Sequence, residues 1–211
     1  MRRRGGALLT LGLALVALAA ALSLYNVLDA RRAARAAALA AQQVRAEIAA
    51  ARAEDSAQPE PARPEAEKPG AQREAAAPAD EAPDEVAPDG TEYLGLLSIP
   101  ALGLELPVAV EYSDAQLRST PCRYSGSALT EDLVIAGHNY RGHFGALSSL
   151  RVGDAVTVTC MDGEALFYTV AAFEVLQPNE AEALTAGTWA LTLFTCTPGG
   201  RERLAVRCSP A

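Results

Sequence analysis

The sequence predicts a mainly β domain over residues 93–211, preceded by a transmembrane helix and an extended linker. Three observations point to this organisation. Residues 5–28 form one uncharged stretch, seven of the 13 prolines lie between residues 59 and 88, and short apolar runs separated by turn residues fill the chain from residue 93 onward. Seven or eight short strands with little helix are typical of an antiparallel barrel or sandwich.

The first element is an anchor over residues 1–28. Its 24 uncharged residues from Gly5 to Leu28 exceed the roughly 20 apolar residues that cross a bilayer core. Alanines at 17, 19 and 21 also fit a cleavable signal peptide, but the apolar region of such peptides is usually only about 7–15 residues long. We therefore expect an uncleaved anchor. Arginines flank it on both sides, so the positive-inside rule does not choose an orientation.

Residues 29–92 are predicted to connect the anchor to the folded domain. Residues 29–55 are rich in alanine and arginine and contain neither proline nor glycine, which favours a helical stalk. Residues 57–91 are rich in proline, alanine and glutamate without any aromatic residue, so they cannot bury enough surface to fold. An extended chain of this composition reaches on the order of 100 Å. This indicates a spacer that holds the domain away from the membrane.

The charge pattern excludes one class of partner. The chain carries 26 acidic and 18 basic residues, and no basic run exceeds three residues. Nucleic-acid binding requires concentrated positive charge to neutralise phosphates, so we expect no nucleic-acid partner.

Seven apolar runs are predicted as strands, at 93–99, 104–110, 133–136, 156–160, 165–176, 189–197 and 204–208. In the fourth run, apolar residues alternate with threonine, which is the pattern of a half-buried strand. One short helix is expected at 143–150, where the apolar residues stand at helical spacing.

The last two strands are predicted to pair through a tight turn. If Gly199 and Gly200 form the centre of a primed hairpin turn, Cys196 stands directly opposite Arg203. Directly opposite residues share one face of a hairpin, with Cβ atoms about 4.5–5.5 Å apart. The hairpin therefore predicts a thiol and a guanidinium side by side.

These two side chains and a histidine form a set that suits acyl transfer. Cys196 needs a base or a counter-charge, because the thiolate is the reactive form of cysteine. His138 directly follows a predicted buried strand, and it can supply this help and later protonate a leaving amine. Arg203 can hydrogen-bond the oxyanion of a tetrahedral intermediate. From these residues alone, a buried structural Cys196 remains the alternative, and His143 is interpreted as a capping or exposed residue.

The remaining cysteines do not indicate a metal or redox site. Cys122, Cys160 and Cys208 form no CxxC motif, and the two histidines of the chain fit no familiar metal spacing. A disulfide among these three cysteines stays open for an extracellular domain, and the sequence does not choose the pair.

The residues around this set resemble the sortases, the cysteine transpeptidases of Gram-positive surfaces. Residues 192–196 read TLFTC, like the sortase TLxTC signature, and residues 136–139 (AGHN) resemble the segment around the sortase histidine, which here lies 58 residues upstream of the cysteine. Residues 203–207 (RLAVR) are similar to the final sortase strand, and residues 97–100 (LSIP) to the start of the domain. The resemblance covers residues 93–211 and does not specify the sortase class.

The resemblance implies an eight-stranded sortase-type β-barrel with short helices, acting as a cysteine transpeptidase or hydrolase. Cys196 would attack an LPXTG-like sorting signal on a surface protein or pilin, and His138 would protonate the departing amine. Arg203 would be the catalytic arginine, with Thr195 and Asn139 as supporting residues. An amine acceptor, such as a peptidoglycan precursor or a pilin lysine, would resolve the thioester. The protein would span the cell membrane once, with a cytoplasmic N-terminus and an extracellular catalytic domain.

The segment before the cysteine strand, residues 177–188, is short for a sortase, in which this region helps to bind the sorting signal. Glu180 and Glu182 resemble the calcium-binding loop of one sortase class. Because two glutamates in an exposed loop are usually only solvated, we expect no calcium and no other cofactor. Arg201 and Arg207 are rivals to Arg203, and we expect both to be dispensable for activity.

Two alternatives to a transpeptidase stay open. The first is a membrane-tethered cysteine peptidase, although the order of histidine before cysteine is unlike papain and no caspase-type QACxG sequence is present. The second is a non-catalytic domain that binds a cell-wall component, with a structural Cys196.

Overall fold

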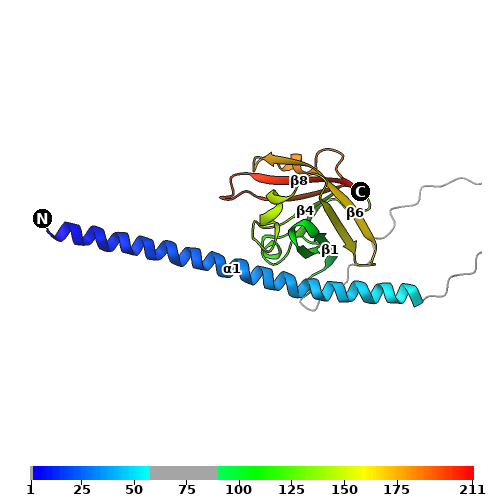
Figure 1. Cartoon of the computed structure of the whole chain (residues 1–211), viewed down its shortest axis with the longest axis horizontal. Helices are drawn as coiled ribbons and strands as arrows, with labels where there is room; N and C mark the ends of the chain where they lie inside the picture. Colours follow the sequence, from blue (N-terminus) through cyan, green and yellow to red (C-terminus); the bar gives the residue numbers. More distant parts are fainter. Residues whose placement is uncertain (1, 58–89) are drawn as a thin grey trace, which may run out of the picture.

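The computed structural model describes residues 2–57 and 90–211, so the predicted linker lies largely outside the described residues. A long helix, α1 (Arg2–Ala57), runs along one side of a β-barrel and carries the N-terminus well beyond it (Figure 1). The strands are β1 (Tyr93–Ile99), β2 (Leu104–Ala109), β3 (Cys122–Ser125), β4 (Leu133–Ala136), β5 (Ala155–Cys160), β6 (Ala165–Leu176), β7 (Leu191–Cys196) and β8 (Arg203–Pro210). The short helices are η1 (Pro100–Leu102), α2 (Asp114–Leu117), η2 (Phe144–Ser149) and α3 (Ala181–Thr185).

The eight strands close into a barrel in the order β1-β2-β3-β4-β7-β8-β6-β5, which confirms the predicted mainly β-barrel with short helices. Neighbouring strands are antiparallel except at β2–β3 and β4–β7, which are parallel. Sequence reasoning missed β3, which is only four residues long and reads CRYS. The helix expected at 143–150 is present as the 3-10 helix η2.

Strands β4, β7 and β8 bury side chains on both of their faces. Toward the barrel interior, Ile135, Leu193 and Val206 belong to the main core. On the outer face, a second cluster joins Ala136, Phe194 and Ala205 to Leu184 of α3, with Leu117 of α2 packed against it. Because side chains alternate between the faces of a strand, residues 196 and 203 continue this outer face at the ends of β7 and β8.

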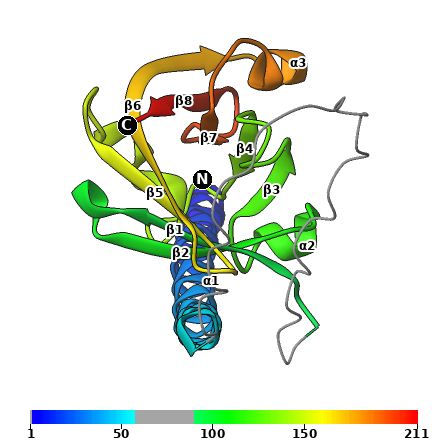
Figure 2. The ribbon, with the colours of Figure 1, turned by 90° about the vertical axis from the view of Figure 1, so that its right-hand side faces the viewer.

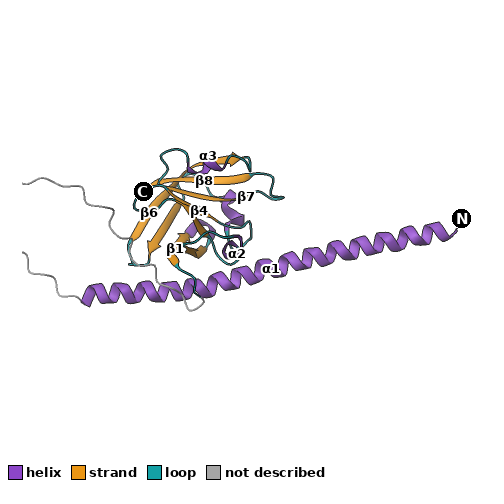
Figure 3. Ribbon diagram, turned by 180° about the vertical axis from the view of Figure 1, so that it is seen from behind, coloured by secondary structure: helices purple, strands orange, loops and turns teal. Residues whose placement is uncertain are grey.

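The helix α1 packs against the barrel on the side opposite α3 (Figures 2 and 3). Its buried residues are spaced three or four apart and are Ala33, Ala37, Ala41, Val44 and Ile48. Most of them pack with Tyr93 and Leu96 of β1 and Ala109 of β2. The small alanine side chains allow the helix to approach the sheet closely. The stalk expected at 29–55 is therefore helical, but it lies against the domain, where we had expected it to form part of a spacer.

Polar contacts along α1 fix the direction of this packing. Arg45 donates to the carboxylate of Glu105 in β2, with 3.0 Å between Nε and Oε1. Arg52 donates to the backbone carbonyl of Gly163 in the β5–β6 turn, also at 3.0 Å from Nε. The β5–β6 turn therefore lies at the C-terminal end of the helix, and the opposite end of the barrel lies toward the apolar N-terminal part.

The N-terminal part of α1 is suited to a membrane. Its large apolar side chains from Leu11 to Leu28 are exposed, and the stretch from Gly5 to Leu28 carries no charged residue. Among the described residues, this is the one helix long and apolar enough to cross a membrane.

Candidate active site

The β7–β8 hairpin brings Cys196 and Arg203 together. They are paired residues of the antiparallel ladder, which confirms the predicted register, and the Arg203 guanidinium donates from Nη1 to Sγ of Cys196 over 3.4 Å. The turn itself differs from the prediction, since Gly200 N–H donates to the Thr197 carbonyl and Pro198 and Gly199 are its central residues. Gly199 has φ 90°, which a type II turn requires at this position. The register survives because the Thr197 N–H donates to the Glu202 carbonyl, so the four-residue loop 198–201 is still centred between Gly199 and Gly200.

The parallel pairing of β4 with β7 brings His138 to the same end of the sheet as Cys196. Residues 133 to 136 pair with residues 191 to 194, always at an offset of 58. The 58-residue spacing between His138 and Cys196 equals this offset, so each residue stands two positions beyond the last pair of the ladder, Ala136 and Phe194. The Gly137 N–H donates to the Phe194 carbonyl at 3.0 Å, which extends the pairing one residue beyond β4.

Tight packing fixes the backbone around His138. A Cβ on Gly137 would lie 2.5 Å from the ring of Phe144, so only glycine fits before the histidine. The Phe144 N–H donates to the His138 carbonyl at 3.1 Å, and two N–H groups, of His143 and Gly145, donate to the Tyr140 carbonyl. The loop therefore folds back on itself and holds His138 at the end of β4.

The His138 ring is half-buried and stacks on Tyr140, with ring centroids 4.8 Å apart and an interplanar angle of 30°. Burial, and secondarily the charge of Arg118, lower its pKa, while Asp114 and Asp29 act in the opposite direction. The neutral imidazole is thereby favoured, which suits a general base. Sequence reasoning missed Tyr140, whose only signal was its place two residues after the histidine.

Three aromatic side chains form a row of ring contacts that ends at Arg203. Its guanidinium carbon lies 6.0 Å from the centre of the Phe194 ring, a cation–π distance. Phe194 in turn meets Tyr124 edge-on at 5.1 Å, and Tyr124 meets Tyr112 edge-on at 5.3 Å. This row of rings supports the guanidinium beside the Cys196 sulfur.

The other three thiols are poor nucleophiles. All four cysteines are free, so no disulfide forms among Cys122, Cys160 and Cys208. Burial raises the pKa of Cys122 and of Cys208 to about 12, and that of Cys160 to about 11. These thiols stay protonated at neutral pH, whereas Cys196 has a cationic donor on its sulfur.

Comparison with known proteins assigns the chain to a family. The family model of the sortase domain matches residues 97–211. The chain belongs to the sortase family. Sortases are cysteine transpeptidases.

Solved sortases share the barrel. Sortase C1 from Streptococcus agalactiae is 29% identical with a TM-score of 0.52, and the match covers 60% of this chain and 72% of that one. A Clostridium perfringens sortase C, solved with the C-terminal cell wall sorting motif, is 25% identical with a TM-score of 0.51, covering 57% and 71%. Sortase A from Corynebacterium diphtheriae is 26% identical with a TM-score of 0.51, covering 57% and 61%. A search of curated proteins finds no match. Because these neighbours are of classes C and A, they do not assign a class to this sortase.

The two residues expected to support the site of this sortase do not converge on the sulfur. Thr195 points to the opposite face of β7 from Cys196 and is 3% exposed, and its Oγ1 has no hydrogen-bond partner within the described residues. The Asn139 side chain lies against Gly145, with Oδ1 3.1 Å from the position of a Cβ on that glycine.

His143 stands at the N-cap position of η2, but the interpretation of its side chain as capping or exposed is wrong. Its side chain is fully buried and makes no capping hydrogen bond to η2. Burial, with His138 as a second cause, lowers its pKa to about 4, against a smaller opposing effect of the Ala33 and Ser119 backbone. Its ring nitrogens have no partner of good hydrogen-bond geometry among the described residues. The prediction failed because the docking of α1, which covers the loop, is not visible in the local sequence.

Arg207, predicted to be dispensable, is buried and structural. Only 2% of its surface is exposed. Its guanidinium donates to Glu174 of β6, to Thr192 of β7 and to the backbone carbonyls of Ala183 and Leu184. It therefore ties α3 to the outer face of the barrel. In the same loop, Glu180 accepts the Gln177 N–H at 2.7 Å, a local turn contact.

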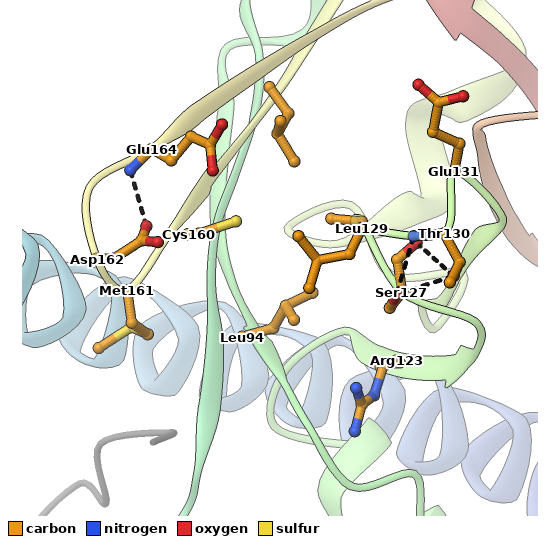
Figure 4. Close-up of a pocket in the computed structure, with 12 residues that line it drawn as sticks. Leu94, Arg123, Ser127, Leu129, Thr130, Glu131, Cys160, Met161, Asp162 and Glu164 are labelled. Carbon is orange, nitrogen blue, oxygen red and sulfur yellow. Dashed lines mark hydrogen bonds between the residues drawn. The ribbon is translucent and has the colours of Figure 1, made fainter. Parts of the chain in front are cut away.

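A cavity of about 420 Å³ lies away from this site, between the β3–β4 loop and the β5–β6 turn. Figure 4 shows Cys160 and Glu164 on one side of it and Leu129 and Ser127 on the other. None of the residues lining it belongs to the Cys196, His138 and Arg203 set. The candidate active site is instead on the outer face of the barrel, at the C-terminal ends of β4 and β7.

Proposed function

We propose that this sortase cleaves an LPXTG-like sorting signal through a thioester on Cys196 and transfers the acyl group to an amine. The observation that carries this proposal is the hydrogen bond from Arg203 to the Cys196 sulfur, together with the β4–β7 register that leads to His138. These three side chains supply a nucleophile, an acid–base group and an oxyanion donor, which are the groups that acyl transfer requires.

In the first half of the reaction, the Cys196 thiolate attacks the carbonyl carbon of a Thr–Gly-type bond. The carbon–sulfur bond forms as the carbonyl π electrons move to oxygen, and Arg203 stabilises the resulting oxyanion. The oxyanion then collapses, the carbon–nitrogen bond breaks, and the His138 imidazolium gives its proton to the departing amine. A thioester on Cys196 and a neutral His138 remain.

In the second half, the acceptor amine attacks the thioester carbonyl. His138 takes a proton from the attacking nitrogen, the carbon–sulfur bond breaks, and the thiolate of Cys196 leaves. The new amide is released and the thiolate–imidazolium pair is restored. Arg203 serves both tetrahedral intermediates, because the oxyanion forms at the same position in each half.

The proposed donors are surface proteins or pilins that carry a sorting signal, and the proposed acceptor is a peptidoglycan precursor or a pilin lysine. The similar Clostridium perfringens sortase C, solved with a cell wall sorting motif, supports the choice of donor. We assign residues 1–28 to the anchor, 29–92 to the stalk and linker, and 93–211 to the catalytic domain. The apolar N-terminal part of α1 supports a single-pass membrane protein, for which we propose a cytoplasmic N-terminus and an extracellular catalytic domain.

The test uses the full chain in lipid nanodiscs, a pool of LPXTG-like peptides and hydroxylamine as the acceptor. We expect mass spectrometry to detect peptide hydroxamates with the wild type and none with Cys196→Ala. Cys160→Ala is the matched control, because this thiol lines the distant cavity, and it should retain hydroxamate formation. Product from Cys196→Ala would refute the assignment of the nucleophile. Free acid without hydroxamate would favour the peptidase, and a folded wild type that forms neither product would favour the binding domain.

A further inference from the structure

A chain of contacts joins the anchor helix to the candidate catalytic histidine. The Tyr140 hydroxyl donates to Oδ2 of Asp29 in α1 at 3.0 Å, and the Tyr140 ring stacks on His138. Burial and the bond to Asp29 raise the pKa of Tyr140, so it remains a protonated donor. Asp29 directly follows the uncharged stretch that ends at Leu28.

The loop that carries His138 packs directly against α1 just after Asp29. A Cβ on Gly142 would lie 2.6 Å from the Ala34 side chain, so glycine allows the loop to touch the helix. Buried His143 lies beside the Ala33 backbone, and its ring centroid is 5.7 Å from that of Tyr140. The contact of Asp29 with Tyr140 is thus one part of a continuous interface.

We propose that Asp29 and Tyr140 are positioning residues for His138, so that the membrane-anchor helix α1 completes the active site. This inference deepens the proposed function and rests on the role of His138 in it. A stacked ring fixes the plane of the imidazole, and the hydrogen bond to Asp29 fixes the stacked ring. Small displacements of a catalytic group are costly, since an error of about 1 Å lowers rates by as much as a hundredfold.

Asp29 also acts on His138 through its charge. Besides Tyr140, the charged or titratable groups that act on the ring are Asp29 from α1, Asp114 from α2, Arg118 and His143. The two carboxylates favour the imidazolium, whereas Arg118 opposes it. The imidazolium is the form that protonates the leaving amine, so loss of the Asp29 charge removes part of its stabilisation.

The same contacts put the site at the membrane end of the barrel. Asp29 meets the site loop and Arg52 meets the β5–β6 turn. These residues are 23 positions apart on one helix, or about 35 Å at 1.5 Å per residue. The cavity beside Cys160 lies at the far end, whereas the loop that carries His138 lies at the end of the apolar stretch.

The test compares Tyr140→Phe, Asp29→Ala and the double variant in the full chain in nanodiscs. Tyr140→Phe keeps the stacked ring and removes only the hydroxyl. We expect each single change to lower kcat about tenfold with KM for the peptide within about twofold, and the double variant to be no slower than the slower single variant. Independent losses that multiply in the double variant would overturn the proposal.

Asp29→Asn separates position from charge, because an amide oxygen still accepts the Tyr140 hydrogen bond. We expect it to retain more of kcat than Asp29→Ala, and to shift the pKa of His138, measured by NMR, to lower values. Glu105→Gln is the matched control, since Glu105 also bonds α1 to the barrel but lies in β2. It should change neither kcat nor the pKa. An unchanged His138 pKa in Asp29→Asn would overturn the inference, and this readout is independent of whether the chain transfers acyl groups.

Discussion

Replacing Arg207 with alanine is expected to destabilise the barrel strongly, although the residue does not touch the reacting groups. The guanidinium is 2% exposed. It donates to the Glu174 carboxylate, to Oγ1 of Thr192 at 3.0 Å, to the Leu184 carbonyl at 2.8 Å and to the Ala183 carbonyl. One side chain thus holds together strands β6, β7 and β8 and the helix α3.

The expected loss of stability is estimated from the acceptor groups that lose the Arg207 guanidinium as their hydrogen-bond donor. The Glu174 side chain is 41% exposed, so water replaces its ion pair and the loss is at most about 1 kcal/mol. The Leu184 carbonyl and the Thr192 hydroxyl are in the interior, and each costs about 1–3 kcal/mol when left unsatisfied. Together they give a loss of about 2–7 kcal/mol, with a middle value of about 4 kcal/mol. At about 3 °C per kcal/mol for a domain of this size, Tm should fall by about 10 °C.

Thermal unfolding followed by circular dichroism measures this directly on the full chain. Arg201→Ala is the matched control, because Arg201 is exposed in the hairpin turn, and its Tm should stay within about 2 °C of the wild type. An Arg207→Ala variant that melts within the same 2 °C would refute the assignment of Arg207 as the anchor of α3.

The arginine, histidine and cysteine side chains of the site region give three further expectations. Arg203→Ala should lower kcat/KM about 10²- to 10³-fold without a large change in Tm, measured by steady-state kinetics and melting, and a fully active variant would contradict its role. His143, with a pKa lowered to about 4 by burial, takes up protons on unfolding between pH 4 and about 6.5. Stability should therefore fall as pH falls through this window, by up to about 1.4 kcal/mol per pH unit, and Tm measured against pH should lose this dependence in His143→Gln. Iodoacetamide at neutral pH should label Cys196 of the folded chain before Cys122 and Cys208, because these two thiols are buried and burial raises their pKa to about 12; equal labelling, read by peptide mass spectrometry, would contradict their burial.

The pairing of Cys196 with Arg203 could be predicted from the sequence because a hairpin register depends only on the midpoint of its loop, which lies between Gly199 and Gly200. The turn type was wrong, since Pro198 and Gly199 are its central residues, yet the pairing was unaffected. The partnership of His138 with Cys196 is different. The sequence resemblance implied it, but its physical cause, the offset of 58 between parallel strands β4 and β7, appears only in the sheet.

The docking of α1 could not be predicted from the local sequence. Ala33, Ala37 and Ala41 lie on one face, but in a helix so rich in alanine this spacing is as typical of a solvated stalk. The burial of Ala37 and Ala41 depends on the barrel strands, which follow after the linker. The wrong interpretation of His143 has the same cause, because that side chain is covered by α1. Contacts between segments that are far apart in the sequence thus explain why the docking of α1 and the burial of His143 were not predicted.

The most direct test of the acyl-transfer site is the intact mass of the full chain incubated with a cleaved sorting-signal peptide and no added amine. We predict a mass increase equal to the acyl fragment, mapped to Cys196 by peptide sequencing, released by hydroxylamine and absent from Cys196→Ala. An acyl adduct on another residue, or peptide cleavage that persists in Cys196→Ala, would contradict the assignment of Cys196 as the nucleophile.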